Sequence, residues 1–444
     1  MDQISQAMAF GLGDISLSEK LNFLKSSYKT ISDELFPLCA ETILESPELM
    51  KIIRDKPKFN AVATLWKCGA ILAHILDAPL IWLSPASPEV FPHQLESLGV
   101  KVNPNIQPSV MSSFVEPMSV LDRFKNIFIS TAWSLWEHHL DINMAKAFRD
   151  SIDKDLPDID IIAKERSVYL ISNSHVATHG SWAYHQNVEN VGGIHCRPGK
   201  QLPAELKEYM DSHPEGVVYV SFGSQFKASS MTSEQKTIFN EAFEELNVPI
   251  IWKWNDDNVS GIPKNVRVSK WLPQNDLLAH PNLKVFVTHG GLLSMQEAIY
   301  HKSTLVGIPL SLDQGANVAR AESNGFAISV DLKTLTKDKL TSAIRKGLGD
   351  ETMRTSIEKM NSLFMSGESP LNRAVNAVER VLKDPTSLQM VKSHSTMDMP
   401  WYQYFGIDIA IYISLAMLMF CFIIWKTCLL CFIRKTKLGK SKIE

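Results

Sequence analysis

Continuous apolar runs alternate with amphipathic stretches through the second half of the chain, and this alternation limits the fold more than any other sequence feature. Runs that are apolar throughout are typical of strands buried on both faces, and the amphipathic stretches between them are typical of the helices that cover a parallel sheet. The clearest such helix is 233–246, with Ser233 in the position of an N-cap. The sequence therefore predicts an α/β domain with strands at 216–224, 248–254, 303–309 and 326–331, and with a run 283–291 that leads into a helix ending near His301.

The first half of the chain shows the same alternation less regularly. Its predicted elements are strands at 58–66, 79–85 and 166–174, a helix from Cys68 to Leu76, and a long aromatic helical stretch at 118–152. A segment with three prolines then separates the halves, which marks a domain boundary. We expect an α/β fold of two Rossmann-like domains facing across a cleft, at 1–195 and 216–385, joined by a linker at 196–215. Ligands of such domains bind at the carboxyl ends of the strands.

The most apolar run of the chain is Ile409 to Trp425, seventeen residues without a charge. With the residues from Trp401 onward it approaches the roughly 20 residues that a bilayer core requires. Six basic residues follow it, so the positive-inside rule places the C-terminus in the cytosol. A buried helix is the alternative, but a soluble helix would not precede so basic a tail. We expect a connector at 386–404, one transmembrane helix at 405–425 in the lipid bilayer, and a basic tail at 426–444.

The ends of the chain suggest a location. Lys440 and Lys442 stand fifth and third from the C-terminus, as in dilysine signals for the endoplasmic reticulum. The expected location is the membrane of that organelle, with the body in the lumen and Asn258 in a glycosylation sequon. The first twenty residues lack the basic start and apolar core of a signal peptide. We therefore expect either a natural N-terminus upstream of Met1 or insertion directed by the anchor.

The charge distribution limits the partners. The net charge is −3, and the tail holds six basic residues and one acid, which leaves −8 on the rest of the chain. An acidic body argues against nucleic acid as a partner. The six cysteines lack the spacing of a metal site or of a disulfide framework.

One turn of the second domain has the composition of an anion site. The predicted strand ends in Thr288-His289-Gly290-Gly291, and a helix follows at once. Two glycines allow a tight turn, and the free N–H groups and the dipole of a helix start suit a phosphate. His289 can donate a further hydrogen bond. A tight strand-to-helix turn with no ligand is the alternative for this motif taken alone.

Other polar residues at predicted strand exits complete a recognisable set. An exposed indole can stack on a planar base, an amide can bond its edge, and a carboxylate can accept bonds from a ribose diol or a sugar. The residues concerned are Trp271 and Gln274 for the base, Glu297 for the ribose, Ser221 and Ser224 for the phosphates, and Asp313 with Gln314 for the sugar. Together they describe a site for a nucleotide-diphosphate sugar.

The segment "WLPQNDLLAHPNLKVFVTHGGLLSMQEAIYHKSTLVGIPLSLDQGAN" resembles the characteristic segment of the UDP-glycosyltransferases, which include the UDP-glucuronosyltransferases. The resemblance extends from about Asp14 to the basic tail. It implies a GT-B fold and an inverting, metal-free transfer from a UDP-sugar. It also implies that Trp271 and Gln274 hold uracil, Glu297 the ribose, His289 and Ser224 the diphosphate, and Asp313 and Gln314 the sugar. Family members often carry Thr-Asn where this chain has Leu292-Leu293, so its phosphate site is more apolar.

The catalytic residues of the family have no match in this chain. The family's base is a His near the first N-terminal strand, a position that falls before Met1, and the Asp that orients it is replaced by Leu65. His74, on a nearby predicted helix, is interpreted as structural. No general base is assigned, and the catalytic residues stay unknown.

Two functions remain open. The first is an inverting transferase that moves glucose or glucuronic acid from UDP-glucose or UDP-glucuronate to a small lipophilic acceptor, as in detoxification, with no cofactor besides the donor substrate. The second is a truncated, catalytically deficient UDP-sugar-binding form that acts as a regulatory or dimer partner. A homo- or hetero-oligomer is compatible with both. Asp158-Ile159-Asp160 imitates a metal-binding DxD motif, but we interpret it as a solvated helix start and expect no metal.

Overall fold

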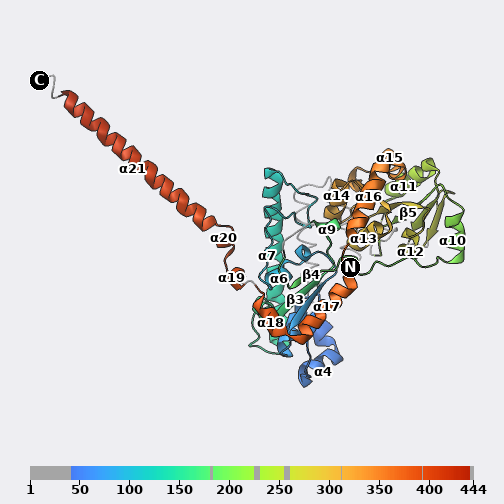
Figure 1. Cartoon of the computed structure of the whole chain (residues 1–444), viewed down its shortest axis with the longest axis horizontal. Helices are drawn as coiled ribbons and strands as arrows, with labels where there is room; N and C mark the ends of the chain where they lie inside the picture. Colours follow the sequence, from blue (N-terminus) through green and yellow to red (C-terminus); the bar gives the residue numbers. More distant parts are fainter. Residues whose placement is uncertain are drawn as a thin grey trace. The chain divides into compact units, whose positions relative to one another are not determined.

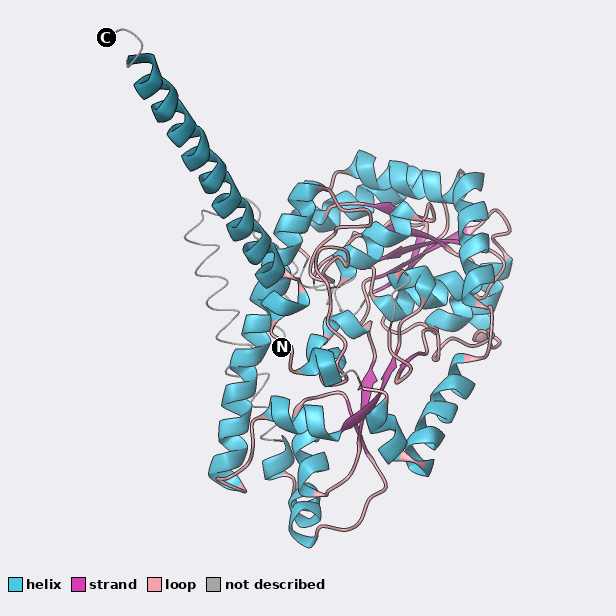
Figure 2. Cartoon of the chain, turned by 60° about the vertical axis from the view of Figure 1, so that its left-hand side comes forward, coloured by secondary structure: helices cyan, strands magenta, loops and turns pink. Residues whose placement is uncertain are grey.

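The computed structural model describes residues 42–180, 184–224, 231–254, 261–311, 313–392 and 394–440. The chain divides into two compact units, one up to Lys392 and one from Ser393 onward. The first unit contains two parallel sheets, each with helices packed on both faces (Figures 1 and 2). The predicted glycosylation residue, Asn258, lies outside the described residues.

The first sheet has the strand order β1-β2-β3-β4, and every neighbouring pair is parallel. A core that includes Trp82 and Phe148 joins it to α5, α7 and α8. The strands and helices predicted for this half are confirmed, whereas β4 was missed because it is three half-buried residues without a strong pattern. The elements are α4 (Pro47–Asp55), β1 (Val62–Thr64), α5 (Cys68–Ile75), β2 (Leu80–Ser84), η2 (Pro88–Val90), α6 (Pro92–Glu96), α7 (Val120–Ser151), α8 (Ile159–Arg166), β3 (Ser167–Ser172), α9 (Val176–His179) and β4 (Val188–Asn190).

The second sheet has the order β10-β9-β8-β5-β6-β7, again with every pair parallel. The chain leaves β5 toward β6 and β7 and then returns to add β8 on the other side, so the strand order reverses between β5 and β8. Crevices form at the carboxyl ends of the strands where such a reversal occurs. The elements up to that reversal are α10 (Ala204–Asp211), β5 (Val217–Ser221), α11 (Ser233–Leu246), β6 (Ile250–Lys253), β7 (Val266–Ser269), α12 (Gln274–Leu278) and β8 (Leu283–Thr288).

The rest of the second sheet and its helices follow the predicted pattern. The elements are α13 (Leu292–His301), β9 (Thr304–Gly307), α14 (Gln314–Ser323), β10 (Ala327–Ser329), η4 (Leu332–Thr334), α15 (Lys337–Gly349) and α16 (Glu351–Phe364). One detail of the prediction is wrong, because Ser233 is the first residue of α11 and Thr232 is its N-cap. Thr232 and Gln235 form a capping box, in which the side chain of each residue accepts a hydrogen bond from the backbone amide of the other.

Helix α17 (Pro370–Lys383) returns to the first sheet, although the sequence placed its residues in the second domain. Ala377 and Val381 pack with Ile81, Tyr169 and other residues of β2 and β3 in one core cluster. Figure 1 shows the same return, with α17 and α18 (Pro385–Met390) beside β3. The apolar face of α17 is buried against the outer face of this sheet, where Leu388 of α18 packs against the same cluster.

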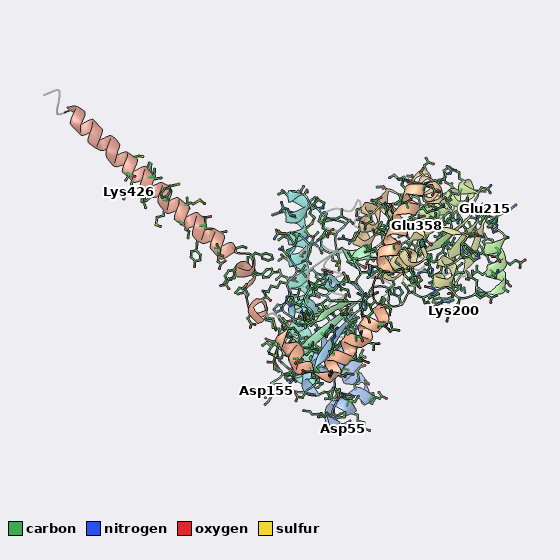
Figure 3. The ribbon with its side chains drawn as sticks, in the orientation of Figure 1. Asp55, Asp155, Lys200, Glu215, Glu358 and Lys426 are labelled. Carbon is green, nitrogen blue, oxygen red and sulfur yellow. The ribbon has the colours of Figure 1, made fainter. Side chains whose placement is uncertain are left out.

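The second unit is helical. It contains α19 (His394–Met397), α20 (Trp401–Tyr404) and α21 (Ile407–Lys440). Residues Ile407–Leu429 of α21 are long and apolar enough to cross a bilayer, which makes this helix a candidate membrane span close to the predicted 405–425. Lys426 lies on the same helix (Figure 3).

Candidate active site

The turn after β8 requires both of its glycines. Gly290 has a φ of +84°, and a Cβ added there would lie 2.4 Å from Cγ2 of Val318. A Cβ on Gly291 would lie 2.6 Å from Nε2 of His289. Gly291 is the N-cap of α13 and offers no side chain to the first amides of the helix. This helix start therefore presents backbone donors and a positive dipole end at the carboxyl edge of the sheet.

His289 lies between this turn and the loop after β5. Its Cε1 is 3.0 Å from where a Cβ on Gly223 would stand, so the two loops touch. Burial, together with the charge of Lys253, lowers the pKa of His289 to about 4, and a hydrogen bond between the ring and the backbone of Ser221 opposes part of this fall. The imidazole is therefore neutral near pH 7 and can act as a single hydrogen-bond donor.

The serine that ends β5 and the one that follows it have different surroundings. Ser221 is buried and in register with Thr288, and its hydroxyl accepts a hydrogen bond from the amide of Gly223 at 3.4 Å. Ser224, three residues beyond β5, is exposed. Ser224 is thus open to a ligand, whereas Ser221 shapes the loop that contacts His289.

Trp271 follows β7 and is 75% exposed, which is unusual for an indole. The ammonium of Lys253, at the end of β6, lies 5.0 Å from the centroid of its ring. Burial lowers the pKa of Lys253. The Lys253 ammonium and an exposed aromatic face therefore stand together at this edge.

Gln274 and Glu297 are in direct contact. The amide Nε2 of Gln274 donates to Oε2 of Glu297 at 2.6 Å and to Oγ of Ser294 at 2.9 Å, and its Oε1 accepts from the hydroxyl of Tyr219 at 3.3 Å. Burial raises the pKa of Glu297, and the bond from Gln274 offsets part of this rise. The carboxylate keeps acceptor capacity beyond the single bond that Gln274 supplies.

Asp313 and Gln314 lie at the start of α14. Oε1 of Gln314 accepts from the amides of Leu310 and Ser311, so this carbonyl holds the preceding loop. Oδ2 of Asp313 accepts from Nδ2 of Asn317 at 2.9 Å, and the same nitrogen donates to the carbonyl of Gly290 at 3.0 Å. Asn317 thereby fixes the carboxylate of Asp313 beside the Gly290 turn.

The structure brings the predicted residues to one edge of the second sheet, each at or just beyond the end of β5, β7, β8 or β9 or on the helix that follows. Two further residues were missed from the sequence. Asn317 stands four positions after Asp313 on a helix, a spacing at which side chains meet, so this spacing was an available signal. Lys253 ends a strand that was predicted correctly, but nothing in the sequence indicates that it lies over Trp271.

The segment that joins the two sheets is bound to this edge by an ion pair and a hydrogen bond. Arg197 binds Asp276 with both of its terminal nitrogens, at 2.6 and 3.1 Å, and the amide of Lys200 donates to the same carboxylate at 2.8 Å. The bond from Arg197 is the main reason that the pKa of Asp276 falls to about 2. Asp276 lies on α12 two residues after Gln274, so this contact holds the helix that carries a predicted base-binding residue. The side chain of Lys200 itself is exposed (Figure 3).

The corresponding edge of the first sheet lacks an acid after β1. Leu65 stands there, and its carbonyl accepts from Nε2 of Gln94 at 2.9 Å. Lys67 follows, buried in contact with Asp141 and 3.3 Å from Asp160. Asp158 is exposed at the N-cap of α8, in agreement with the predicted solvated helix start. Asp160 pairs with Lys67. His138, Asp141 and Asp160 bring ligand atoms within 4.8 Å of one another, but the Lys67 ammonium already contacts both carboxylates.

Two parallel α/β domains with a nucleotide-type site at the strand ends define the class of GT-B glycosyltransferases. The structure matches the glycotransferase of kitacinnamycin with a TM-score of 0.56 and 17% identity over 80% of this chain and 84% of that one. It matches LpCGTa, solved in complex with UDP, with a TM-score of 0.52 and 18% identity over 83% and 90% of the two chains.

The sequence comparisons narrow this class to a family. The model for UDP-glucoronosyl and UDP-glucosyl transferase matches residues 12–442, so the chain belongs to the UDP-glycosyltransferase family. UDP-glucuronosyltransferase 2B7 of Homo sapiens is 29% identical over 90% of this chain and 75% of its own length. UDP-glucuronosyltransferase 2B15 of Homo sapiens is 30% identical over 91% and 76%. The chain is a transferase of this family.

Proposed function

We propose that the chain transfers glucose or glucuronic acid from UDP-glucose or UDP-glucuronate to a small lipophilic acceptor. The observation that carries the donor assignment is the gathering of Trp271, Gln274, Glu297, His289 and Asp313 at one sheet edge. In this proposal Trp271 stacks on uracil and Gln274 bonds its edge. The carboxylate of Glu297 accepts hydrogen bonds from the ribose hydroxyls, and its contact with Gln274 orients it for this role.

The phosphates and the sugar occupy the remaining positions. The α13 amides, His289 and Ser224 bind the diphosphate, where a neutral imidazole donates without placing a buried charge beside Lys253. Asp313 accepts from sugar hydroxyls in the orientation that Asn317 gives it. The acceptor hydroxyl attacks C1 of the sugar from the side opposite UDP, so the configuration at C1 inverts. Helix dipole, histidine and serine stabilise the negative charge that develops on the leaving diphosphate.

The candidate span and the tail support a proposed location. We place the chain as a single-pass protein in the membrane of the endoplasmic reticulum, with the body in the lumen and the basic tail in the cytosol. The spacing of Lys440 and Lys442 supports the organelle, and the charge that follows α21 supports the orientation.

UDP binding to the Trp271→Ala variant tests the donor site. Loss of a stacked ring costs about 1–3 kcal/mol for base–aromatic contacts, so we expect UDP to bind roughly 5- to 150-fold more weakly by titration calorimetry. Trp401→Ala is the matched control, because Trp401 is another exposed indole, 65% accessible, in the second unit. Equal affinity of wild type and a folded Trp271→Ala variant would contradict the stacking role.

The second candidate is a catalytically deficient form that binds UDP-sugar and acts with a partner chain. Leu65 in place of an acid after β1 favours it. UDP binding without sugar transfer to any acceptor would support this candidate, whereas transfer of a radiolabelled sugar by the 444-residue chain would exclude it.

A further inference from the structure

The long helix α7 has an exposed apolar face in its first half. The helix runs along one side of the first unit (Figure 1), and Phe124 and Phe128 are each 72% exposed. Residues three or four positions apart lie on one side of a helix, so the exposed apolar side chains form a continuous surface, here named the α7 strip. Such a surface marks a site of contact with a membrane or another protein. The strip consists of Val120, Leu121, Phe124, Ile127, Phe128 and Leu135.

The opposite side of α7 is fixed to the first domain by Asn126, which is fully buried. Its Nδ2 donates to the carbonyls of Pro104 and Gln107 at 2.7 and 2.8 Å. Its Oδ1 accepts from the amide of Ser109 at 2.7 Å. Two positions along a helix correspond to a rotation of about 200°, so Asn126 lies roughly opposite Phe124. These bonds hold the α7 strip outward, and the helix cannot rotate to bury it without breaking them.

The charges beside the α7 strip are positive. Arg123 and Lys125 are exposed and lie on the two sides of Phe124. Between Val120 and Leu135 the one acid is Asp122, which accepts from the Ser119 hydroxyl at 2.6 Å on the far side of the helix. Helices that lie in a membrane surface combine apolar and basic side chains in this way, with the aliphatic stems of the basic residues along the apolar surface. A second copy of the chain fits less well, because facing strips would bring like charges together.

The path of the chain keeps a bilayer within reach of α7. Lys392, the last residue of the first unit, donates through Nζ to the carbonyl of Lys164 in α8, the helix that follows α7, at 2.6 Å. The candidate membrane span begins at Ile407, so fourteen residues lie between them. Fourteen extended residues reach at most about 50 Å, close to the roughly 48 Å length of the 32-residue α7. The first unit therefore stays near the membrane that α21 enters.

We propose that the α7 strip lies in the surface of the bilayer that α21 spans. Phe124 and Phe128 enter the upper part of the acyl chains, and Arg123 and Lys125 reach the lipid phosphates. The partner is a phospholipid surface, and the helix lies along the membrane without crossing it. This contact is a second attachment besides α21. It requires that α21 spans a bilayer, and it is independent of the transferase activity.

Photolabelling of the full-length chain in a membrane tests this contact. The chain is reconstituted into vesicles of phosphatidylcholine and phosphatidylserine and irradiated with a lipid-soluble diazirine, which labels protein within the acyl region. Mass spectrometry of the peptides then locates the label. We expect label on residues 119–136 as well as on α21, and α21 serves as the internal standard for the yield.

The double variant Phe124→Ser with Phe128→Ser removes the two rings. The label on residues 119–136, relative to that on α21, should fall roughly tenfold or more, because burial of each ring favours the membrane-bound state by about this factor. The thermal unfolding midpoint should stay unchanged, since both rings are exposed. Leu371→Ser with Val375→Ser is the matched control, because these residues of α17 are also exposed and four positions apart, and it should leave the label on α7 unchanged.

The other occupants of the α7 strip give different results. Label on α21 but not on residues 119–136 of wild type would overturn the proposal. Cross-links between copies that disappear in the phenylalanine variant, with no lipid label on the strip, would identify a second copy as the partner instead. A lowered unfolding midpoint of that variant, again with no label on the strip, would show that the rings pack within the chain. Label on neither helix would overturn the membrane span of α21 as well.

Discussion

Replacing Gly290 by alanine tests the packing that shapes the phosphate turn. Two penalties act at this position. The backbone has a φ of +84°, and a left-handed conformation costs an alanine about 1–2 kcal/mol. The new Cβ would also lie 2.4 Å from Cγ2 of Val318 and 3.2 Å from the backbone oxygen of Gln314, and overpacking of this kind costs about 1–3 kcal/mol. The variant should therefore lose about 2–5 kcal/mol, a large part of the roughly 5–15 kcal/mol of a folded domain.

The two penalties can be separated by a second substitution. Val318→Ala removes the methyl groups that clash but leaves the backbone conformation unchanged. A double-mutant cycle should therefore show a favourable coupling of about 1–3 kcal/mol, with the remaining 1–2 kcal/mol still lost. Urea unfolding gives the stabilities, and calorimetry gives the affinity for UDP, which should fall because the turn and α14 shift.

Gly349→Ala is the matched control for this experiment. Its Cβ would meet nothing within 4 Å, and the residue ends α15, so the substitution should be neutral or slightly stabilising. A Gly290→Ala variant as stable as this control would refute the close approach of α14 to the turn. A cycle with no coupling would refute the assignment of the clash to Val318.

Two further substitutions probe contacts around the site. The bond from Arg197 depresses the pKa of Asp276 from 3.8 to about 2, so its stabilisation is complete above pH 4 and is lost as the pH falls toward 2. Asp276→Asn should therefore unfold at a lower urea concentration than wild type at pH 7, and this difference in urea midpoint should disappear near pH 2. A difference that does not change with pH would contradict the ion pair. Gln296 is fully buried between the domains, where it donates to the carbonyl of Asn173 and accepts from the amide of Gly193. Gln296→Leu should lower stability by about 1–3 kcal/mol in thermal unfolding, because the Asn173 carbonyl is left unpaired, and an unchanged midpoint would show that the contact is dispensable.

The parallel sheets and most of their strands could be predicted because buried strands of such sheets are apolar throughout. Strand β7 was missed because Val266–Ser269 is only partly buried and Arg267 interrupts its apolar pattern. The return of α17 to the first sheet could not be predicted, since an amphipathic helix carries no information about which sheet its apolar face will cover.

The positions of the proposed donor residues could be predicted because these residues lie at strand ends, which the sequence places well; their roles stay a prediction. The role of Ser221 could not be resolved, because a serine at a strand end has the same appearance in sequence whether its hydroxyl faces solvent or the turn.

The path of α17 has a mechanical consequence. The chain passes between the two domains twice, once before β5 and once before α17, so the second domain is held by a pair of connections instead of a single one. A domain held at one point can rotate about any axis, whereas a domain held at two points rotates mainly about the line that joins them. Rotation about that line is therefore less restricted than twisting of one domain against the other.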